Sequence, residues 1–153
     1  MQRHQAAIAG GLIAGVLTTA VMVAGRKSGV LTKTLDRDAV DWIDDVTGSR
    51  AMIGDTGTSV VEFANHLGAS AAFAAAVPLL RDLAPSLSPL ALGTLYGTAL
   101  YAVNIGCIAP MLGITEGEVE AGPRKAGERW AIHVLQAVIT TVLAERLRSA
   151  DSD

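Results

Sequence analysis

Four long apolar stretches constrain this chain more than any other feature of its sequence. They cover residues 6–25, 60–80, 89–112 and 130–147. A helix needs roughly 20 residues to cross a ~30 Å hydrocarbon core, and it pairs its backbone polar groups within the segment. The sequence therefore predicts an all-α integral membrane protein, with four transmembrane helices arranged as an up-down bundle.

The remaining residues leave little room for a separate soluble unit, so we predict a single domain over residues 1–153. Charged residues make up 18% of the chain and lie mostly between the apolar stretches. The net charge is −3 and there is no basic run, which argues against a nucleic-acid partner. The single cysteine, Cys107, lies within the third apolar stretch and excludes an internal disulfide or a cysteine-based metal motif.

The connection after the first apolar stretch, residues 26–59, carries an amphipathic pattern. Apolar residues recur at helical spacing: Leu35, Ala39, Trp42, Ile43 and Val46. Acidic residues fall on the other side: Asp38, Asp41, Asp44 and Asp45. This pattern predicts an interfacial helix over about residues 35–46, packed on the rim of the bundle with its acids facing outward. The following residues, 48–57, and the later connection, 113–129, are expected to be turns and loops.

The distribution of basic residues indicates an orientation in the membrane. An even number of spans places both termini on one side, with Arg3, Arg81, Arg146 and Arg148. The other eight of the 12 Lys and Arg residues lie in the two longer connections. The positive-inside rule therefore favours cytoplasmic longer connections.

Small residues recur every four positions in three of the four apolar stretches. The pairs are Gly11 and Gly15, Gly68 and Ala72, and Gly93 and Gly97. Helices in lipid associate mainly through close packing, and small residues let their backbones approach. We therefore expect these six positions to lie at helix–helix contacts.

Four ionisable residues lie inside or beside the apolar stretches: Glu62, His66, Glu128 and His133. Ionisable groups in a membrane are costly and are candidate functional positions. The second and fourth stretches run in the same direction, so all four residues fall near one membrane face, within about 10 Å of depth at ~1.5 Å per residue.

Three interpretations of these four residues stay open. The first is structural, with the histidines bonded to backbone or Asn104 and the glutamates in first helical turns. The second is a proton-active cluster. The third is a ligand site, in which His66 and His133 hold a haem iron or all four residues hold a metal ion. The E-x-x-H spacing of di-iron bundles is absent, and no nucleophile with an adjacent base is recognisable.

Several short motifs together resemble the DUF1440 family of small inner-membrane proteins, which includes the YagU-type proteins. The motifs that carry this resemblance span residues 60–148: Asn-His-Leu-Gly at 65–68, Gly-Thr-Leu-Tyr-Gly at 93–97, Pro-Met-Leu-Gly at 110–113, His133, and Glu-Arg-Leu-Arg at 145–148. The resemblance implies a four-helix membrane protein with His66 and His133 as functional positions and a link to acid tolerance. It supplies no reaction.

These observations predict a small polytopic membrane protein without catalytic activity. We expect it in a prokaryotic cytoplasmic (inner) membrane, because a small set of lysines beside many arginines and alanines is typical of GC-rich prokaryotic genomes. The small-residue faces predict a homo-oligomer or an accessory subunit of a larger membrane complex. The alternative is a membrane-embedded His/Glu site that binds haem or metal or relays protons.

Overall fold

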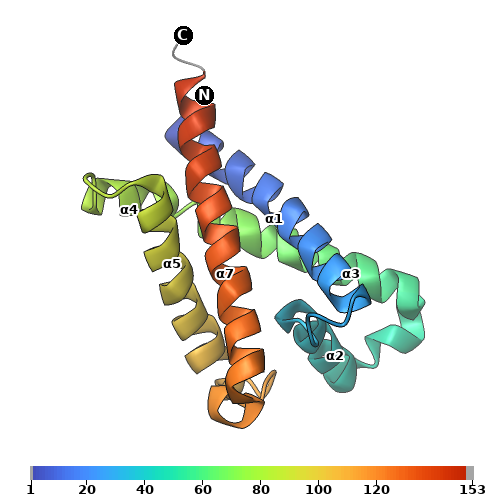
Figure 1. Cartoon of the computed structure of the whole chain (residues 1–153). Helices are drawn as coiled ribbons and strands as arrows, with labels where there is room; N and C mark the ends of the chain where they lie inside the picture. The colour runs from blue at the N-terminus through green and yellow to red at the C-terminus, as the bar shows by residue number, and fades with distance from the viewer. Residues whose placement is uncertain (1, 151–153) are drawn as a thin grey trace.

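The computed structural model describes residues 2–150, and helices account for most of this part of the chain (Figure 1). The elements are α1 (Arg3–Lys27), α2 (Leu35–Thr47), α3 (Ser49–Ala74), α4 (Val77–Leu83), α5 (Pro89–Val103), the π-helix η1 (Asn104–Ile108), α6 (Ala109–Met111) and α7 (Glu118–Ser149). The described residues contain no strand, so the all-α prediction is confirmed.

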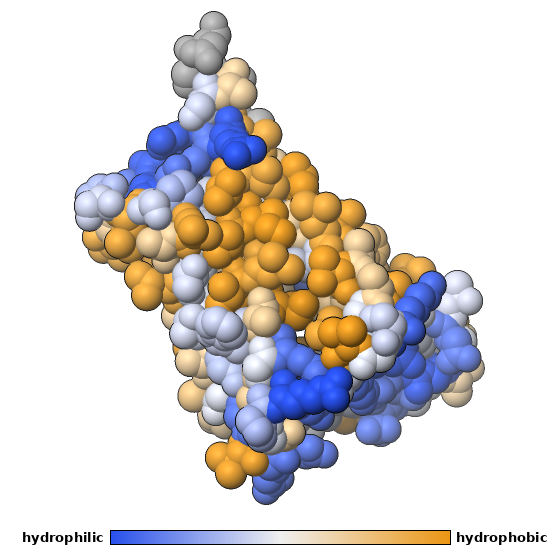
Figure 2. Space-filling model, in the orientation of Figure 1, coloured by the Kyte–Doolittle hydropathy of each residue, from blue (hydrophilic) through white to orange (hydrophobic). Residues whose placement is uncertain are grey.

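Three helical segments of the described chain are long and apolar enough to cross a membrane: Arg3–Lys27, Ser49–Leu83 and Pro89–Met111. They contain the first three predicted stretches. Figure 2 shows an apolar belt between two polar ends on the face in view. The fourth predicted stretch is helical, within α7, but is not among these three segments. Its polar residues explain the difference, since His133, Gln136, Glu145 and Arg146 lower the mean hydropathy of residues 130–147.

Helix α1 lies between α3 and α7 and packs closely on both through glycines. A methyl group added at Gly11 would lie 2.3 Å from the Cβ of Ala74 on α3. One added at Gly10 would lie 3.0 Å from the backbone nitrogen of Ala144 on α7. Gly15 also has no room for a side chain, because Ser70 lies beside it. These contacts place the glycine-rich face of α1 in the centre of the fold.

Helix α5 packs on the other side of α7 through a second pair of glycines. Methyl groups at Gly93 and Gly97 would each lie 2.6 Å from a Cα atom of α7. Gly68 and Ala72 of α3 behave differently, since Gly68 has no atom within 4 Å of an added methyl group and Ala72 is exposed. Four of the six predicted packing positions therefore lie at contacts within the chain, and two face outward.

Helix α2 occupies the predicted interfacial range and packs on α3. The expectation that its acids face outward was wrong for three of the four. Asp38 pairs with Arg129 on α7 (3.1 Å), Asp41 with Lys33 (2.8 Å), and Asp44 accepts a hydrogen bond from the backbone of Arg50. Periodicity missed these pairs because the basic partners come from outside the helix.

Two regions expected to be loops are helical, with a glycine break in each. Helix α3 begins at Ser49 and changes direction at Gly54, where φ is 67°. Helix α7 begins at Glu118 and changes direction at Gly122, where φ is 80°. Glycine reaches this left-handed region without the steric cost that other residues have, so the chain turns and then resumes its helix.

Pro110 coincides with a change of helical register near the end of the third span. Proline has no backbone N–H and cannot donate to the carbonyl four residues earlier. Just before it, the N–H of Ala109 bonds the carbonyl of Asn104, five residues back, within the π-helix η1. Asn104 thus stands at the junction between α5 and a wider turn.

The glycine contacts generate a stability prediction. Gly11→Ala should lower the free energy of unfolding by about 1–3 kcal/mol, the usual cost of overpacking a tight contact, because the added methyl group meets Ala74 and the backbone of Ser70. Gly68→Ala is the matched control and should leave stability unchanged or slightly raised. Thermal unfolding in one mild detergent compares them, and equal effects would contradict the α1–α3 contact.

Candidate functional site

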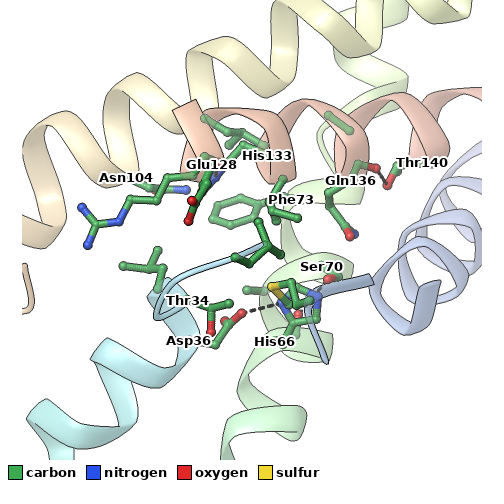
Figure 3. A pocket seen from close by; sticks show the side chains of 18 of the residues that line it. Thr34, Asp36, His66, Ser70, Phe73, Asn104, Glu128, His133, Gln136 and Thr140 are labelled. Atoms are coloured by element: carbon green, nitrogen blue, oxygen red, sulfur yellow. Dashed lines mark hydrogen bonds and ion pairs between the residues drawn. The ribbon is translucent and has the colours of Figure 1, made fainter. Parts of the chain in front are cut away.

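A cavity of about 130 Å³ lies between α3, α5 and α7 and is closed on one side by the chain that enters α2 (Figure 3). Because α3 packs on α1 and hardly touches α7, a space is left between these helices. Figure 3 shows Asp36 and His66 on one side of this space and Gln136 on α7 across it.

The cavity combines an apolar wall with a polar mouth. The apolar part of the wall includes Phe73, Leu100 and Ile132, and the polar side, called the mouth here, includes Lys33, Asp36 and Glu128. Uncharged polar side chains lie between them: Thr34, Ser70, Asn104, Gln136 and Thr140. Few polar groups on an apolar wall are typical of small-molecule sites.

His66 is held at both ring nitrogens. Its Nδ1 lies 3.0 Å from a carboxylate oxygen of Asp36, in the first turn of α2. Its Nε2 lies 3.1 Å from the hydroxyl of Thr18 on α1, and that hydroxyl lies 2.5 Å from the side-chain amide of Gln136 on α7. One imidazole therefore ties α1, α2 and α3 together beside the cavity.

The order Thr18, His66, Asp36 matches the hydroxyl–imidazole–carboxylate order of a hydrolytic triad. A triad needs its hydroxyl where a substrate carbon can reach it. Thr18 is fully buried and is not part of the cavity wall. Its oxygen also lies within hydrogen-bond distance of the carbonyl of Ala14. The arrangement is therefore a packing network, not a nucleophile with its base.

His133 lines the same cavity from α7. Its Nδ1 lies 2.8 Å from the backbone carbonyl of Arg129, four residues earlier, and its ring meets Tyr101 edge-on with the ring centres 6.0 Å apart. A carbonyl only accepts hydrogen bonds, so Nδ1 carries a proton. In the neutral ring, Nε2 is then an unprotonated acceptor.

Glu128 fastens the connection between α1 and α2 to α7. Its carboxylate accepts hydrogen bonds from the backbone N–H (2.8 Å) and the hydroxyl (2.7 Å) of Thr32, and from Arg124 (3.0 Å). Burial alone would raise the pKa of this carboxyl, but these hydrogen bonds outweigh burial and hold the pKa below its usual range.

Glu62 lies outside the cavity wall and faces basic partners instead. Its two carboxylate oxygens meet Arg26 at 3.1 Å and Arg37 at 3.4 Å. Of the four ionisable residues predicted to lie together, three line one cavity: His66, Glu128 and His133. Glu62 instead anchors α3 to the end of α1 and to α2.

Among the described residues, the most buried charged side chain is one that the sequence did not indicate as a site residue. Arg129 is 5% exposed and pairs with Asp38 (3.1 Å) and Glu118 (2.7 Å). It was counted only as one of the basic residues that set the orientation. Asp36, Thr18 and Gln136 were also missed as site residues, although a polar residue within an apolar stretch was a usable signal for the last two.

Neither haem nor metal fits this arrangement. The described residues contain no group of three or more His, Cys, Asp or Glu side chains placed to hold a metal ion. An axial haem ligand needs a free ring nitrogen, and both nitrogens of His66 are already bonded. The cavity is also close to the roughly 150 Å³ that holds a single benzene ring, far less than a porphyrin occupies.

Comparisons with known proteins do not assign the chain to a group. No protein-family model, no curated protein and no solved structure matches it. The resemblance to the DUF1440 family therefore stays a prediction from its motifs.

The contacts of Glu128 predict an acid-sensitive connection. A pKa below the usual value of 4.5 means that the ionised carboxylate stabilises the fold above that pH, and that this contribution is lost as the pH falls through the lowered pKa. Glu128→Gln should remove this pH dependence of stability, and residues 31–34 should exchange their amide hydrogens faster at every pH. Amide hydrogen exchange of this segment at matched pH values tests it.

Glu120→Gln is the control for this experiment, since Glu120 is exposed. Equal exchange in both variants would contradict the anchoring role of Glu128.

Proposed function

We propose that this chain is a non-catalytic integral membrane protein of four crossing helices that binds a small molecule in the cavity between α3, α5 and α7. The four crossings are α1, α3 with α4, α5 through α6, and the residues of α7 from about 130 onward. The observation that carries the proposal is the cavity itself, a ring-sized space with an apolar wall and a polar mouth.

The position of the cavity supports a ligand that reaches it at the membrane boundary. Its apolar residues, among them Phe73 and Leu100, lie on α3 and α5, which are apolar enough to cross a bilayer. Two of its charged residues lie where the chain enters α2, Lys33 just before this helix and Asp36 in its first turn. A molecule with an apolar body and a polar group matches both parts.

A proton relay is less well supported by the same contacts. The series of hydrogen-bonded side chains runs from Asp36 through His66 and Thr18 to Gln136. Beyond it, with the amide of Gln136 oriented so that its nitrogen faces Thr18, that nitrogen donates to the backbone carbonyl of Ala14, 3.1 Å away. The opposite polar end is held separately by the ion pairs of Arg3 with Asp82 and of Arg81 with Glu145.

The proposal places the protein in a prokaryotic inner membrane, as in the DUF1440 family that its motifs resemble. The apolar helices and the charges gathered in the connections support a membrane location. In this setting the lipid bilayer covers the exposed apolar side chains of α1, such as Leu12, Val16 and Leu17.

A pair of alanine substitutions on α3 tests the binding proposal. Ala69 lines the cavity, whereas Ala72 is exposed on the outer side of the same helix. Ala69→Phe should fill the space and abolish binding of fluorobenzene, a ring-sized probe, and Ala72→Phe should leave binding intact. Fluorine NMR in lipid nanodiscs, corrected with empty nanodiscs, measures the bound fraction. Equal binding by both variants would refute the cavity as the site.

A second candidate function is association with another membrane helix, either from a second copy or from a larger complex. The outer face of α3 favours it, because Ala64, Gly68 and Ala72 are all exposed there. Asn65 is exposed next to them with an amide that no described residue bonds, and such amides promote helix association in lipid.

The association candidate predicts that Gly68→Leu converts an oligomer or complex into the single chain. Gly106→Leu is the control, since Gly106 is also exposed and has no atom near an added methyl group. Native mass spectrometry of protein released from its own membranes gives the assembly state. A single chain in the wild type would exclude this candidate.

A further inference from the structure

We propose that the cavity selects a neutral ring that bears a hydroxyl group, of the phenol or hydroquinone type, and that this hydroxyl donates to Nε2 of His133. The inference rests on the proposed binding function and names the chemistry of its ligand. It follows from three properties of the wall: the unbonded Nε2 of His133, charged groups that already have partners, and the size of the space.

The free acceptor is the Nε2 atom of His133. The other ring nitrogen is occupied by the carbonyl of Arg129, on the residue's own helix. His133 can therefore contact a ligand through Nε2. In the neutral ring this atom only accepts a hydrogen bond, so the ligand must supply the donor. A hydroxyl supplies one, while a ring with only carbonyl oxygens does not.

The charged groups around the cavity already have partners within the protein. Asp36 faces His66, and Glu128 faces Arg124. The two remaining charged groups of the wall are likewise paired, Lys33 with Asp38 and Asp41, and Arg129 with Asp38 and Glu118. A charged ligand would have to compete with these existing pairs, so a neutral molecule fits best.

The shape and the remaining polar groups favour an aromatic ring. The cavity of about 130 Å³ is close to the space that holds benzene. The ring of Phe73 and the side chains of Leu100 and Ile132 supply apolar surface. Asn104, at the start of the π-helix, has a side-chain amide that no described residue bonds, so it can meet a second polar atom of the ring.

The test compares two probes that differ only in the hydroxyl group. 4-Fluorophenol and fluorobenzene are titrated into the full-length protein in nanodiscs and followed by fluorine NMR. We expect 4-fluorophenol to bind about three- to tenfold more tightly after correction for partitioning, the range of one net hydrogen bond. We also expect it to shift the ¹⁵N resonance of Nε2 of His133.

His133→Leu should remove the preference, so that both probes bind alike, and His4→Leu should keep it, because His4 is exposed at the start of α1, outside the cavity wall. Ala69→Phe should abolish binding of both probes. It serves as a second variant if His133→Leu fails to fold.

The outcomes separate this inference from the binding function. The hydroxyl inference would be overturned if the wild type bound the two probes with equal affinity and Ala69→Phe bound neither. The cavity would then remain a binding site. Failure of both probes to bind the wild type would overturn both proposals.

A third probe distinguishes two sources of such a ring. If 4-heptylphenol displaces 4-fluorophenol, the cavity admits a ring that carries a chain, as a membrane-borne quinol does. If it does not, the site takes a free phenol from water. Each result supports the hydroxyl-bearing ring, and lack of a hydroxyl preference in the first titration overturns it.

Discussion

The close contact of α1 with both α3 and α7 is the constraint on which the rest of the structure depends. Glycines at positions 10, 11 and 15 remove the side chains that would hold the three backbones apart. Because α1 takes the central position, α3 lies against α1 and is kept away from most of α7. The cavity is the space that this separation leaves, so one glycine face both builds the bundle and opens the site.

The charged connection completes what the helix packing leaves open. Asp36 and Asp38, in the first turn of α2, reach His66 on α3 and Arg129 on α7. Glu128 holds the preceding residues through Thr32. These contacts join the two helices that α1 keeps apart, and they do so at the polar end, where water and opposite charges limit the cost of burying a carboxylate. The mouth of the cavity is therefore stabilised by ion pairs and its wall by apolar packing.

The sequence predicted the elements of this fold better than their contacts. Hydropathy located the helices, and periodicity located α2, because both signals are local. The partners of His66 could not be predicted, since Asp36 and Thr18 lie 30 and 48 positions away along the chain. Amphipathicity placed Asp38 outside because it cannot register a basic residue arriving from α7. The four-residue spacing predicted a helix contact at both Gly11 and Gly68. Only the three-dimensional packing distinguishes the buried glycine from the exposed one.

The cavity has a consequence for the energy of the fold. In an apolar setting, a polar group without a hydrogen-bond partner is destabilising, so buried polar groups are almost always bonded. His66 and Glu128 follow this rule through protein contacts, whereas Arg129 pairs its terminal nitrogens but leaves its buried Nε without a partner among the described residues. His133 and Asn104 meet the cavity with hydrogen-bonding capacity that described side chains do not use. Filling the space with larger apolar residues would improve packing but would leave that capacity unmet. A small molecule with an apolar ring and a donor group satisfies both requirements at once, which is why the same wall argues for a ligand and for its chemistry.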